Sequence, residues 1–163
     1  MIRILSCSEL FIIQELAYRI WPISYKDMIS KDQIDYMLNW MYDLAVLQNN
    51  HEKGDSFYVY FKDKSPVGFI HLEPLNEHLK LQKLYVLPEF QKYGIGSAFL
   101  NFIHEHALLN NFQCILLQVN RQNSAVNFYL KNGFIIEKEE DFNIGNGFEM
   151  NDFVMKKIIL KDK

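Results

Sequence analysis

Cysteine is scarce in this sequence, which contains only Cys7 and Cys114. Two isolated cysteines supply neither a disulfide framework nor a structural zinc site, so we expect no metal and a reducing cytoplasmic environment. Long apolar stretches are also missing: no run reaches the roughly 18 residues that a membrane-spanning helix needs. We therefore expect no membrane partner.

Positive charge is not in excess either, because 17 Lys and Arg stand against 20 Asp and Glu, a formal net charge of −3. Nucleic-acid-binding domains usually present a basic face, so we expect no nucleic-acid partner. The acidic balance is compatible with a cationic substrate. Without repeats, low-complexity tracts or long linkers, the 163 residues are predicted to form one domain spanning 1–163.

Helix and strand signals alternate along the chain. Ser6 with Glu9 and Ser30 with Gln33 form capping boxes that predict two helices, the first limited by Pro22. The predicted order is β-α-α-β-β-β-α-β-α-β-β, an α/β (α+β) mixed sheet with helices on its faces and a parallel crossover between the fourth and fifth strands. After the first strand, the expected strands are 57–61, 67–73, 79–87, 113–119, 134–142 and 148–160, and the last two form a hairpin through Asn146-Gly147.

A glycine-containing loop, Gln91-x-x-Gly94-x-Gly96, joins the fourth expected strand to an amphipathic helix. The first amides of a helix have no partners within it, and the helix dipole places partial positive charge there. Lys92 and Ser97 offer further donors for a phosphate group. The ending of a P-loop is absent, and the glycine spacing differs from the dinucleotide fingerprint. We interpret the loop as a pyrophosphate cradle, with a plain tight turn as the alternative.

The strand before this loop has an irregular apolar pattern. Leu79 and Leu81 alternate in one phase, and Leu84 and Val86 alternate in the other. The phase change predicts a β-bulge that separates the strand from its parallel neighbour and leaves backbone groups unpaired at 84–86. A pantetheine arm could pair with those groups like an added strand. Burial of the strand on both faces is an equally good explanation.

A second motif follows the fifth expected strand and reads Asn123…Ala125…Phe128-Tyr129…Gly133-Phe134. In order and spacing, this run and the glycine loop resemble the two cofactor motifs of the GCN5-related N-acetyltransferase (GNAT) superfamily. The spacing from Asn123 to Phe128 is one residue shorter than in many members. The closing run 144–155 is similar to the last hairpin of bacterial members that include polyamine-type acetyltransferases.

The resemblance implies a GNAT-like fold with splayed parallel fourth and fifth strands, and a single N-acetyltransferase domain. It also implies acetyl-CoA as the acetyl donor, with CoA as product. The cofactor-binding residues that it implies are backbone groups of Leu84, Tyr85 and Val86 for pantetheine, the segment Gln91, Lys92, Tyr93, Gly94, Ile95, Gly96 and Ser97 for pyrophosphate, and Asn123 and Tyr129 beside the pantetheine and the sulfur.

The chemistry of amide formation suggests roles for two of these residues. The oxyanion of the tetrahedral intermediate needs a donor, and the backbone amide near Val86 would serve. The leaving thiolate needs a proton, and a tyrosine hydroxyl with a pKa of about 10 is close enough to a thiol's roughly 8.5 to supply it. With the family likeness, we predict Tyr129 as general acid. Core packing beside Phe128 is the alternative role.

A general base is harder to assign. An amine of lysine-like pKa is almost fully protonated at neutral pH, so a proton must be removed before attack. Some family members carry an acidic residue on the fourth strand, but residues 81–84 read Leu-Gln-Lys-Leu. We predict Glu73 as the catalytic base. His71 on the same strand face could also drive a water relay, and Asp152 is a third candidate.

Aromatic residues interleaved with acids near the N-terminus indicate an acceptor site. Trp21 and Tyr25 would suit a cationic amine, although these aromatics could equally be core residues. We therefore predict an acetyl-CoA-dependent N-acetyltransferase for a primary amine, with a small-molecule or polyamine-like acceptor. Alternatives are a protein N-terminal or lysine acetyltransferase, a non-catalytic acyl-CoA-binding module, and a nucleotide-binding regulator. The sequence leaves a homodimer open.

Overall fold

The computed structural model describes residues 1–159, so the predicted end of the last strand at Leu160 lies outside the described residues. Backbone contacts divide the chain into two compact units. Unit 1 comprises Met1–Glu73 and Lys83–Phe99, and unit 2 comprises Pro74–Gln82 and the chain from Leu100 onward. Seven strands pair in the order β1-β2-β3-β4-β5-β7-β6, which confirms the mixed sheet. One domain spanning 1–163 stays a prediction.

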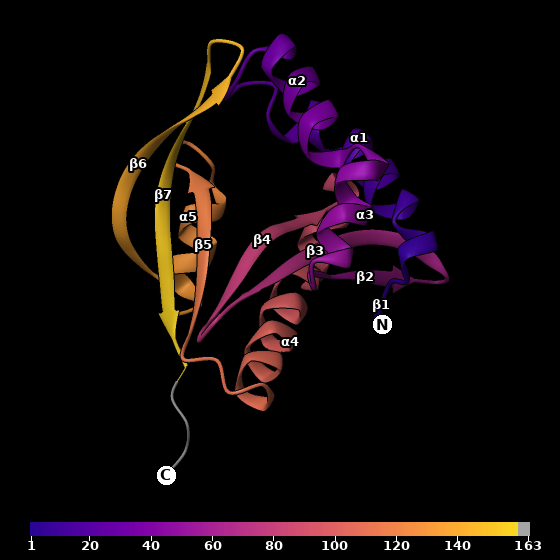
Figure 1. The fold of residues 1–163 in the computed structure, drawn as a ribbon, viewed down its shortest axis with the longest axis vertical. Coiled ribbons are helices and arrows are strands. Elements are labelled where there is room, and N and C mark those ends of the chain that lie inside the picture. The colour runs from indigo at the N-terminus through magenta and orange to yellow at the C-terminus, as the bar shows by residue number, and fades with distance from the viewer. Residues whose placement is uncertain (160–163) are drawn as a thin grey trace. The chain divides into compact units, whose positions relative to one another are not determined.

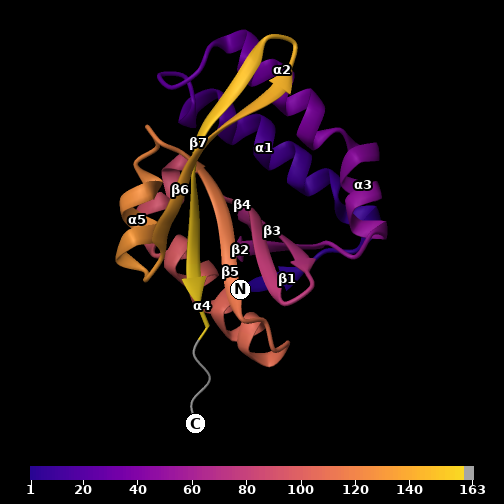
Figure 2. The ribbon, with the colours of Figure 1, turned by 60° about the vertical axis from the view of Figure 1, so that its left-hand side comes forward.

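Unit 1 contains a small antiparallel sheet with three helices on one side of it (Figures 1 and 2). Alternation explains its strands: Phe57 and Val59 point inward from β2, and Phe69 is fully buried on β3. Ile13, Leu16, Ala17 and Ile20 form the buried face of the first helix. The elements are β1 Ile2–Ile4, η1 Cys7–Glu9, α1 Phe11–Ser24, α2 Lys31–Tyr42, α3 Leu44–Glu52, β2 Ser56–Lys62, β3 Ser65–Leu75, β4 His78–Val86 and η2 Pro88–Tyr93, of which β3 and β4 run on into unit 2.

Three helices precede β2, where two were predicted. Asp43 has an extended backbone, with ψ 136°, and its carboxylate accepts a hydrogen bond from the Ala45 amide over 2.8 Å. This N-cap ends α2 and begins α3. The apolar periodicity continued from α2 into α3, which is why one long helix was expected.

Both predicted N-caps are present, and the reciprocal hydrogen bonds of a capping box are seen at Ser6 and Glu9. The two caps start different kinds of helix. Ser30 caps α2 by accepting a hydrogen bond from the Gln33 amide. The box formed by Ser6 and Glu9 opens a short 3-10 segment rather than α1 itself. The prediction that Pro22 limits the first helix was wrong by two residues, because α1 runs to Ser24. A proline in the last turn removes only one late hydrogen bond.

Unit 2 contains the rest of the sheet and two helices. The elements are α4 Ile95–Leu109, whose first turn belongs to unit 1, β5 Cys114–Asn120, α5 Ala125–Lys131, β6 Ile135–Gly145 and β7 Phe148–Ile158. In Figures 1 and 2, β5, β7 and β6 lie side by side with α5 packed along them. Asn146 and Gly147 both have positive φ, 54° and 77°, which confirms the predicted hairpin turn.

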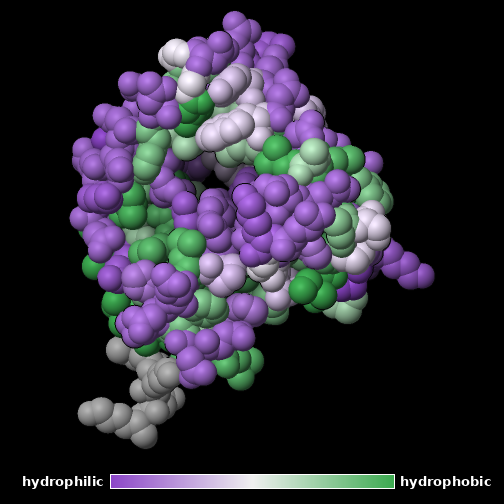
Figure 3. Space-filling view, viewed as in Figure 1, coloured by the Kyte–Doolittle hydropathy of each residue, from purple (hydrophilic) through white to green (hydrophobic). Residues whose placement is uncertain are grey.

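The outer strand of unit 2 is strongly charged. β6 is the last strand in the pairing order, and its mostly exposed run Glu137–Asp141 contains four acids and one lysine. Hydrophilic side chains accordingly cover much of this strand in Figure 3. Charged residues on an edge strand oppose pairing with other chains.

The predicted parallel crossover is confirmed. The register of β4 with β5 joins His78–Leu81 to Cys114–Leu117 in parallel, and β5 pairs on its other edge with β7 from Cys114 to Asn120. The last pair of that register is Leu81 with Leu117. Two residues later, at Lys83, β4 enters unit 1. Among residues 1–159, no helix combines the length and apolarity that crossing a membrane requires.

Candidate functional site

The glycine loop of unit 1 forms an exposed strand-to-helix connection. β4 ends at Val86, η2 follows after Leu87, and Gly94 adopts the left-handed conformation with φ 75° and ψ 11° before α4 begins at Ile95. A Cβ at Gly94 would meet open space, so glycine is needed here for its backbone angle rather than for lack of room.

Three backbone amides at the start of α4 lie outside its hydrogen-bond ladder. The Ala98 amide donates to the Gly94 carbonyl over 3.0 Å, which leaves the N–H groups of Ile95, Gly96 and Ser97 as the unpaired first turn. Gly96 is half-buried, and Ser97 is exposed. These donors, with the positive end of the helix dipole, suit a diphosphate.

Side chains hold this loop in place. The Gln91 side-chain amide donates to the Val86 carbonyl over 3.3 Å, which joins the loop to the end of β4. The Lys62 ammonium lies 3.8 Å from the centre of the Tyr93 ring. An ion pair between Arg19 of α1 and Glu89 spans 3.3 Å. Lys92 is exposed, so its ammonium is available to an anion in solution.

The strand segment Leu84–Val86 is packed closely against β3. A Cβ at Gly68 would lie 2.9 Å from the Tyr85 carbonyl oxygen, closer than real Cβ contacts. Glycine at this position therefore lets the two backbones approach. The Leu87 amide donates to the Val67 carbonyl over 2.8 Å and fixes the end of the strand.

The Tyr85 side chain belongs to an aromatic cluster that includes both residues predicted to contact the acceptor. Its hydroxyl lies 2.8 Å from the Tyr25 hydroxyl, and its ring centre lies 5.7 Å from that of Trp21. Trp21 donates to the Tyr42 hydroxyl over 3.1 Å. With exposed fractions of 3% and 8%, Trp21 and Tyr25 pack mainly inside unit 1, and their contact with an acceptor stays a prediction.

The base candidates on β3 differ in environment. His71 is buried, with 2% exposure, and contacts two charged side chains, Asp55 and Lys83. Glu73 is half-buried two residues along the same strand face. Asp55 and Lys83 were missed by sequence reasoning. Placing the β3–β4 turn at Asn76-Glu77 would have set Gln82 opposite His71, with Lys83 the next residue along the neighbouring strand.

The second motif lies in unit 2, where α5 follows β5. The Asn123 side-chain oxygen accepts a hydrogen bond from the Ala125 amide over 2.9 Å, so Asn123 supports the turn that leads into α5 and keeps its NH₂ group as a donor. Tyr129 is buried, with 7% exposure, and its ring lies between those of Phe128 and Phe134, at 5.4 and 5.5 Å. The predicted packing beside Phe128 is therefore real, and catalysis by its hydroxyl stays a prediction.

Asp152 is a buried carboxyl on β7 of unit 2. Burial raises its pKa to about 6, and Asp141 adds to this rise, whereas the cations Arg121 and Lys80 oppose it. The same arginine also pairs with Glu139 and Asp141 of β6. A carboxyl with such a pKa is partly protonated near neutral pH.

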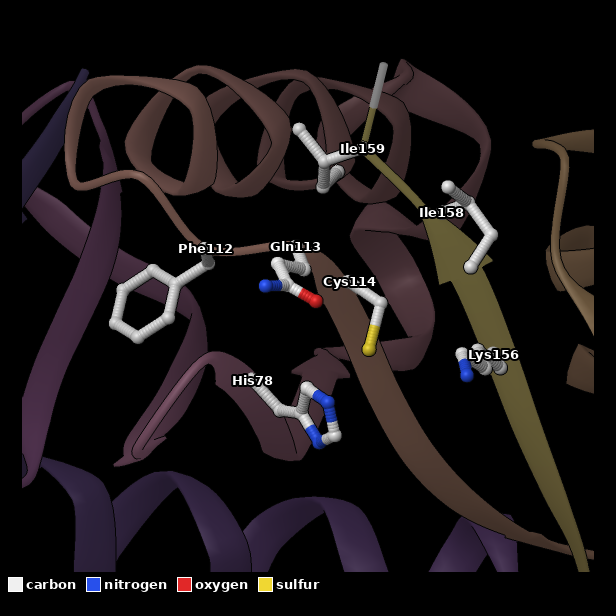
Figure 4. A pocket seen from close by; sticks show the side chains of 7 residues that line it. All are labelled: His78, Phe112, Gln113, Cys114, Lys156, Ile158 and Ile159. Atoms are coloured by element: carbon white, nitrogen blue, oxygen red, sulfur yellow. The ribbon is translucent and has the colours of Figure 1, made fainter. Parts of the chain in front are cut away.

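Unit 2 also has a pocket of about 300 Å³ that contains none of the predicted site residues. His78, Cys114 and Lys156 border it, together with apolar side chains (Figure 4). Burial raises the pKa of the Cys114 thiol, which keeps it protonated and a poor nucleophile. Among residues 1–159, no cluster of three or more His, Cys, Asp or Glu is arranged to hold a metal ion.

Comparison with known families identifies the family of the chain. Residues 53–136, just over half of the chain, match the model of the acetyltransferase (GNAT) domain. The chain belongs to the GNAT family. The matched range includes the glycine loop, β4 and the Asn123–Phe134 motif, so the predicted family is confirmed on the residues that suggested it.

Full-length relatives belong to the same family. The chain is 29% identical to a spermidine N(1)-acetyltransferase of Thermoplasma acidophilum, over 96% of this chain and 95% of the relative. Its fold is similar to that of the PaiA N-acetyltransferase from the same organism, solved with coenzyme A, with a TM-score of 0.83 and 29% identity over 97% and 98% of the two chains. The ribosomal-protein-S18-alanine N-acetyltransferase of Escherichia coli shares the fold, with a TM-score of 0.77 at 14% identity over 100% and 96% of the two chains.

This GNAT protein is an N-acetyltransferase that transfers an acetyl group from acetyl-CoA to an amine. The donor set of the loop fits that cofactor, because first-turn amides outside the helical hydrogen-bond ladder and an exposed lysine provide the N–H groups that a diphosphate requires.

Proposed function

We propose that the enzyme acetylates a small primary amine of polyamine type. The observation that carries this proposal is the similarity over almost the whole chain to a spermidine N(1)-acetyltransferase. The acidic net charge of −3 adds weak support, because a polyamine is polycationic at neutral pH.

The donor side of the reaction is assigned to the two features of unit 1 described above. Amides of Ile95, Gly96 and Ser97, with Gln91, Lys92, Tyr93 and Gly94 of the same segment, hold the diphosphate. Backbone groups of Leu84, Tyr85 and Val86 hold the pantetheine arm. The hydrogen bond from Gln91 to the Val86 carbonyl supports this assignment, because it ties the two features into one rigid element.

Two groups then act on the developing charges. Bound acetyl-CoA supplies an activated thioester carbonyl, and the Val86 amide stabilises negative charge on the oxygen of that carbonyl. The Tyr129 hydroxyl donates a proton to the leaving sulfur, with Asn123 contacting the pantetheine or phosphate side. Burial of Tyr129 among Phe128 and Phe134 supports a fixed hydroxyl direction.

The acceptor amine loses its proton on the helix-covered face of unit 1. Two residues on one face of β3, Glu73 and His71, are the candidates for removing that proton, directly or through a water relay. Trp21 and Tyr25 contact the acceptor beside Tyr85, whose hydroxyl is hydrogen-bonded to that of Tyr25. A cytoplasmic location, supported by the two free cysteines, and a homodimer stay predictions.

An amine panel tests the proposed acceptor. The purified protein is mixed with acetyl-CoA and spermidine, spermine, putrescine, free lysine or a lysine peptide, and thiol release is followed together with the mass of the product. We expect the highest kcat/KM with a polyamine. A higher kcat/KM with the peptide would favour a protein acetyltransferase, and binding of acetyl-CoA without turnover of any amine would favour a non-catalytic module.

A further inference from the structure

Three charged or titratable side chains, Asp55, His71 and Lys83, contact one another in a row inside unit 1. The His71 Nε2 atom lies 2.6 Å from a carboxylate oxygen of Asp55, and its Nδ1 atom lies 3.2 Å from the Lys83 ammonium nitrogen. Asp55 follows α3, His71 lies on β3 and Lys83 lies on β4. Three separate elements therefore bring together groups that are distant in sequence.

Donor and acceptor capacities fix the direction of these hydrogen bonds. An ionised carboxylate only accepts, and an ammonium group only donates. A neutral His71 therefore carries its proton on Nε2 toward Asp55 and accepts from Lys83 at Nδ1. In this arrangement the unprotonated imidazole nitrogen faces Lys83 and can receive one more proton.

Neighbouring aromatic rings keep water away from His71, the central residue of this row. The Phe57 ring is stacked on His71, with ring centres 4.3 Å apart and planes inclined by 24°. The Lys83 nitrogen lies 5.3 Å from the centre of the Tyr42 ring. The Asp55 side chain is 11% exposed and that of His71 is 2% exposed, so their pairing is electrostatically strong.

Lys83 connects this row to the proposed reaction site. It is half-buried and directly precedes Leu84–Val86, the backbone segment assigned to the thioester-bearing arm. It also occupies the strand on which some family members carry an acidic residue, where this sequence has none. In place of a carboxylate, this part of the strand therefore holds the Lys83 amine, which contacts the buried His71.

We propose that Asp55, His71 and Lys83 form the proton relay that deprotonates the acceptor amine, a proposal that rests on the proposed function. Lys83 passes one N–H proton to Nδ1 of His71, where a new N–H bond forms, and the Asp55 carboxylate holds the resulting imidazolium. The neutral Lys83 amine then takes a proton from the acceptor ammonium. The electron pair left on the acceptor nitrogen forms a C–N bond at the thioester carbonyl, the C–S bond breaks, and the sulfur leaves with a proton from the proposed acid. The second proton of the acceptor nitrogen restores that acid, and the proton held on His71 later returns through Lys83 to water.

Other titratable groups near the relay define its pH response. Burial raises the pKa of Tyr42 well above its ordinary value, so this ring stays neutral in the working range. Asp55 is the acid from the α3–β2 turn. The remaining titratable groups on the neighbouring strands, at alternate positions from His71 and Lys83, are Glu73 and Tyr85.

Substitutions of Lys83 test the relay most sharply. Lys83→Met keeps the aliphatic stem and removes the base, and Lys83→Arg keeps the positive charge but cannot give up its proton at working pH. We expect both variants to lower kcat at pH 7.5 by about 100-fold, with acetyl-CoA affinity within about threefold of wild type. Rescue of turnover by arginine would overturn the proposal, since a role in charge or packing alone would survive that change.

The pH profile separates a relay from a structural role. Wild-type kcat/KM should level off as pH rises, whereas the Lys83→Met rate should keep rising tenfold per pH unit toward the amine's own pKa of roughly 10. Asp55→Asn removes the carboxylate that stabilises the protonated His71, so it should lower kcat and move the rising limb of the profile toward lower pH. If kcat/KM of Lys83→Met levelled off as in wild type, and that of Glu73→Gln kept rising with pH instead, the relay would be overturned and Glu73 would be the base.

Controls keep the failure of the relay distinct from failure of the proposed function. Wild-type turnover is measured first: acetyl-CoA binding without acetylation of any amine at any pH would reject the proposed function itself. His51→Gln, at the end of α3, is the matched histidine control and should retain wild-type turnover. Stabilisation of each variant by acetyl-CoA in a thermal-shift assay verifies that it is folded.

Discussion

The Gln91 side chain donates a hydrogen bond to the Val86 carbonyl and so fixes the glycine loop to the end of β4. One end of this bond lies in the proposed diphosphate loop and the other in the proposed pantetheine-binding strand. The bond therefore sets the distance between two parts of one extended ligand. Preorganisation of this kind lowers the cost of ordering a binding site.

Removing this bond should weaken cofactor binding more than it weakens the fold. Gln91→Ala removes a hydrogen bond worth about 1 kcal/mol, which corresponds to a roughly fivefold higher KM for acetyl-CoA. The exposed Gln48 of α3 offers a matched control, since Gln48→Ala should leave KM unchanged. Equal KM values for both variants, measured by thiol release, would argue against a coupling role for Gln91.

Two glycines with the same geometry allow a matched test of the loop. Gly94 and Gly147 have φ of 75° and 77°, and a Cβ at either would meet open space. Alanine at each position should cost roughly 1–2 kcal/mol of backbone strain and lower Tm by a few degrees. Only Gly94→Ala should also raise the Kd for CoA in calorimetric titration. A similar Kd change in Gly147→Ala would show that strain alone explains the effect.

The proposed acid can be removed with little change in packing. Tyr129→Phe keeps the ring between Phe128 and Phe134 and removes only the hydroxyl. We expect unchanged CoA affinity and a kcat lower by about 100-fold, because proton donation to the leaving sulfur is lost. Tyr60→Phe, on β2, is the control. Full turnover of Tyr129→Phe under conditions where chemistry limits the rate would exclude Tyr129 as the acid.

The raised pKa of Asp152 predicts how the stability of the fold depends on pH. Its folded-state pKa of about 6 exceeds the ordinary value of 3.8, so the folded state binds the proton more tightly than the unfolded state. The free energy of unfolding should therefore fall as pH rises from about 4 to above 6, by up to about 3 kcal/mol. Asp152→Asn should remove this loss and raise Tm at pH 8 relative to wild type.

Urea unfolding at pH 4 and pH 8 checks the Asp152 prediction. The difference in unfolding free energy between Asp152→Asn and wild type should be clear at pH 8 and small at pH 4. A variant that is less stable than wild type at pH 8 would mean that the ionised carboxylate is stabilised by Arg121 and Lys80 more than burial penalises it.

Local signals made much of this fold predictable. The Asn146-Gly147 turn, the Ser30 cap and the glycine at position 94 each reflect a backbone requirement that few residues satisfy, so the sequence revealed them. The break at Asp43 was missed because the apolar stripe continued across it. An aspartate can cap a helix or lie on its surface, and only the backbone angle at Asp43 distinguishes the two.

The candidate site was predictable where it consists of main chain. Backbone donors of the loop follow from glycine spacing, whereas the contacts of His71 depend on the register between strands and on a turn after α3. Asp55 and Lys83 lie 16 and 12 residues from His71. Their contacts with His71 form only in the folded protein, and no periodicity in the sequence indicates them.

The central claim is that the first-turn amides of α4 bind the diphosphate of acetyl-CoA, and a crystal structure of the complex tests it most directly. The account predicts diphosphate oxygens about 2.7–3.2 Å from the backbone nitrogens of Ile95, Gly96 and Ser97, with the pantetheine arm along Leu84–Val86. A complex in which the diphosphate lies away from these amides would contradict the account.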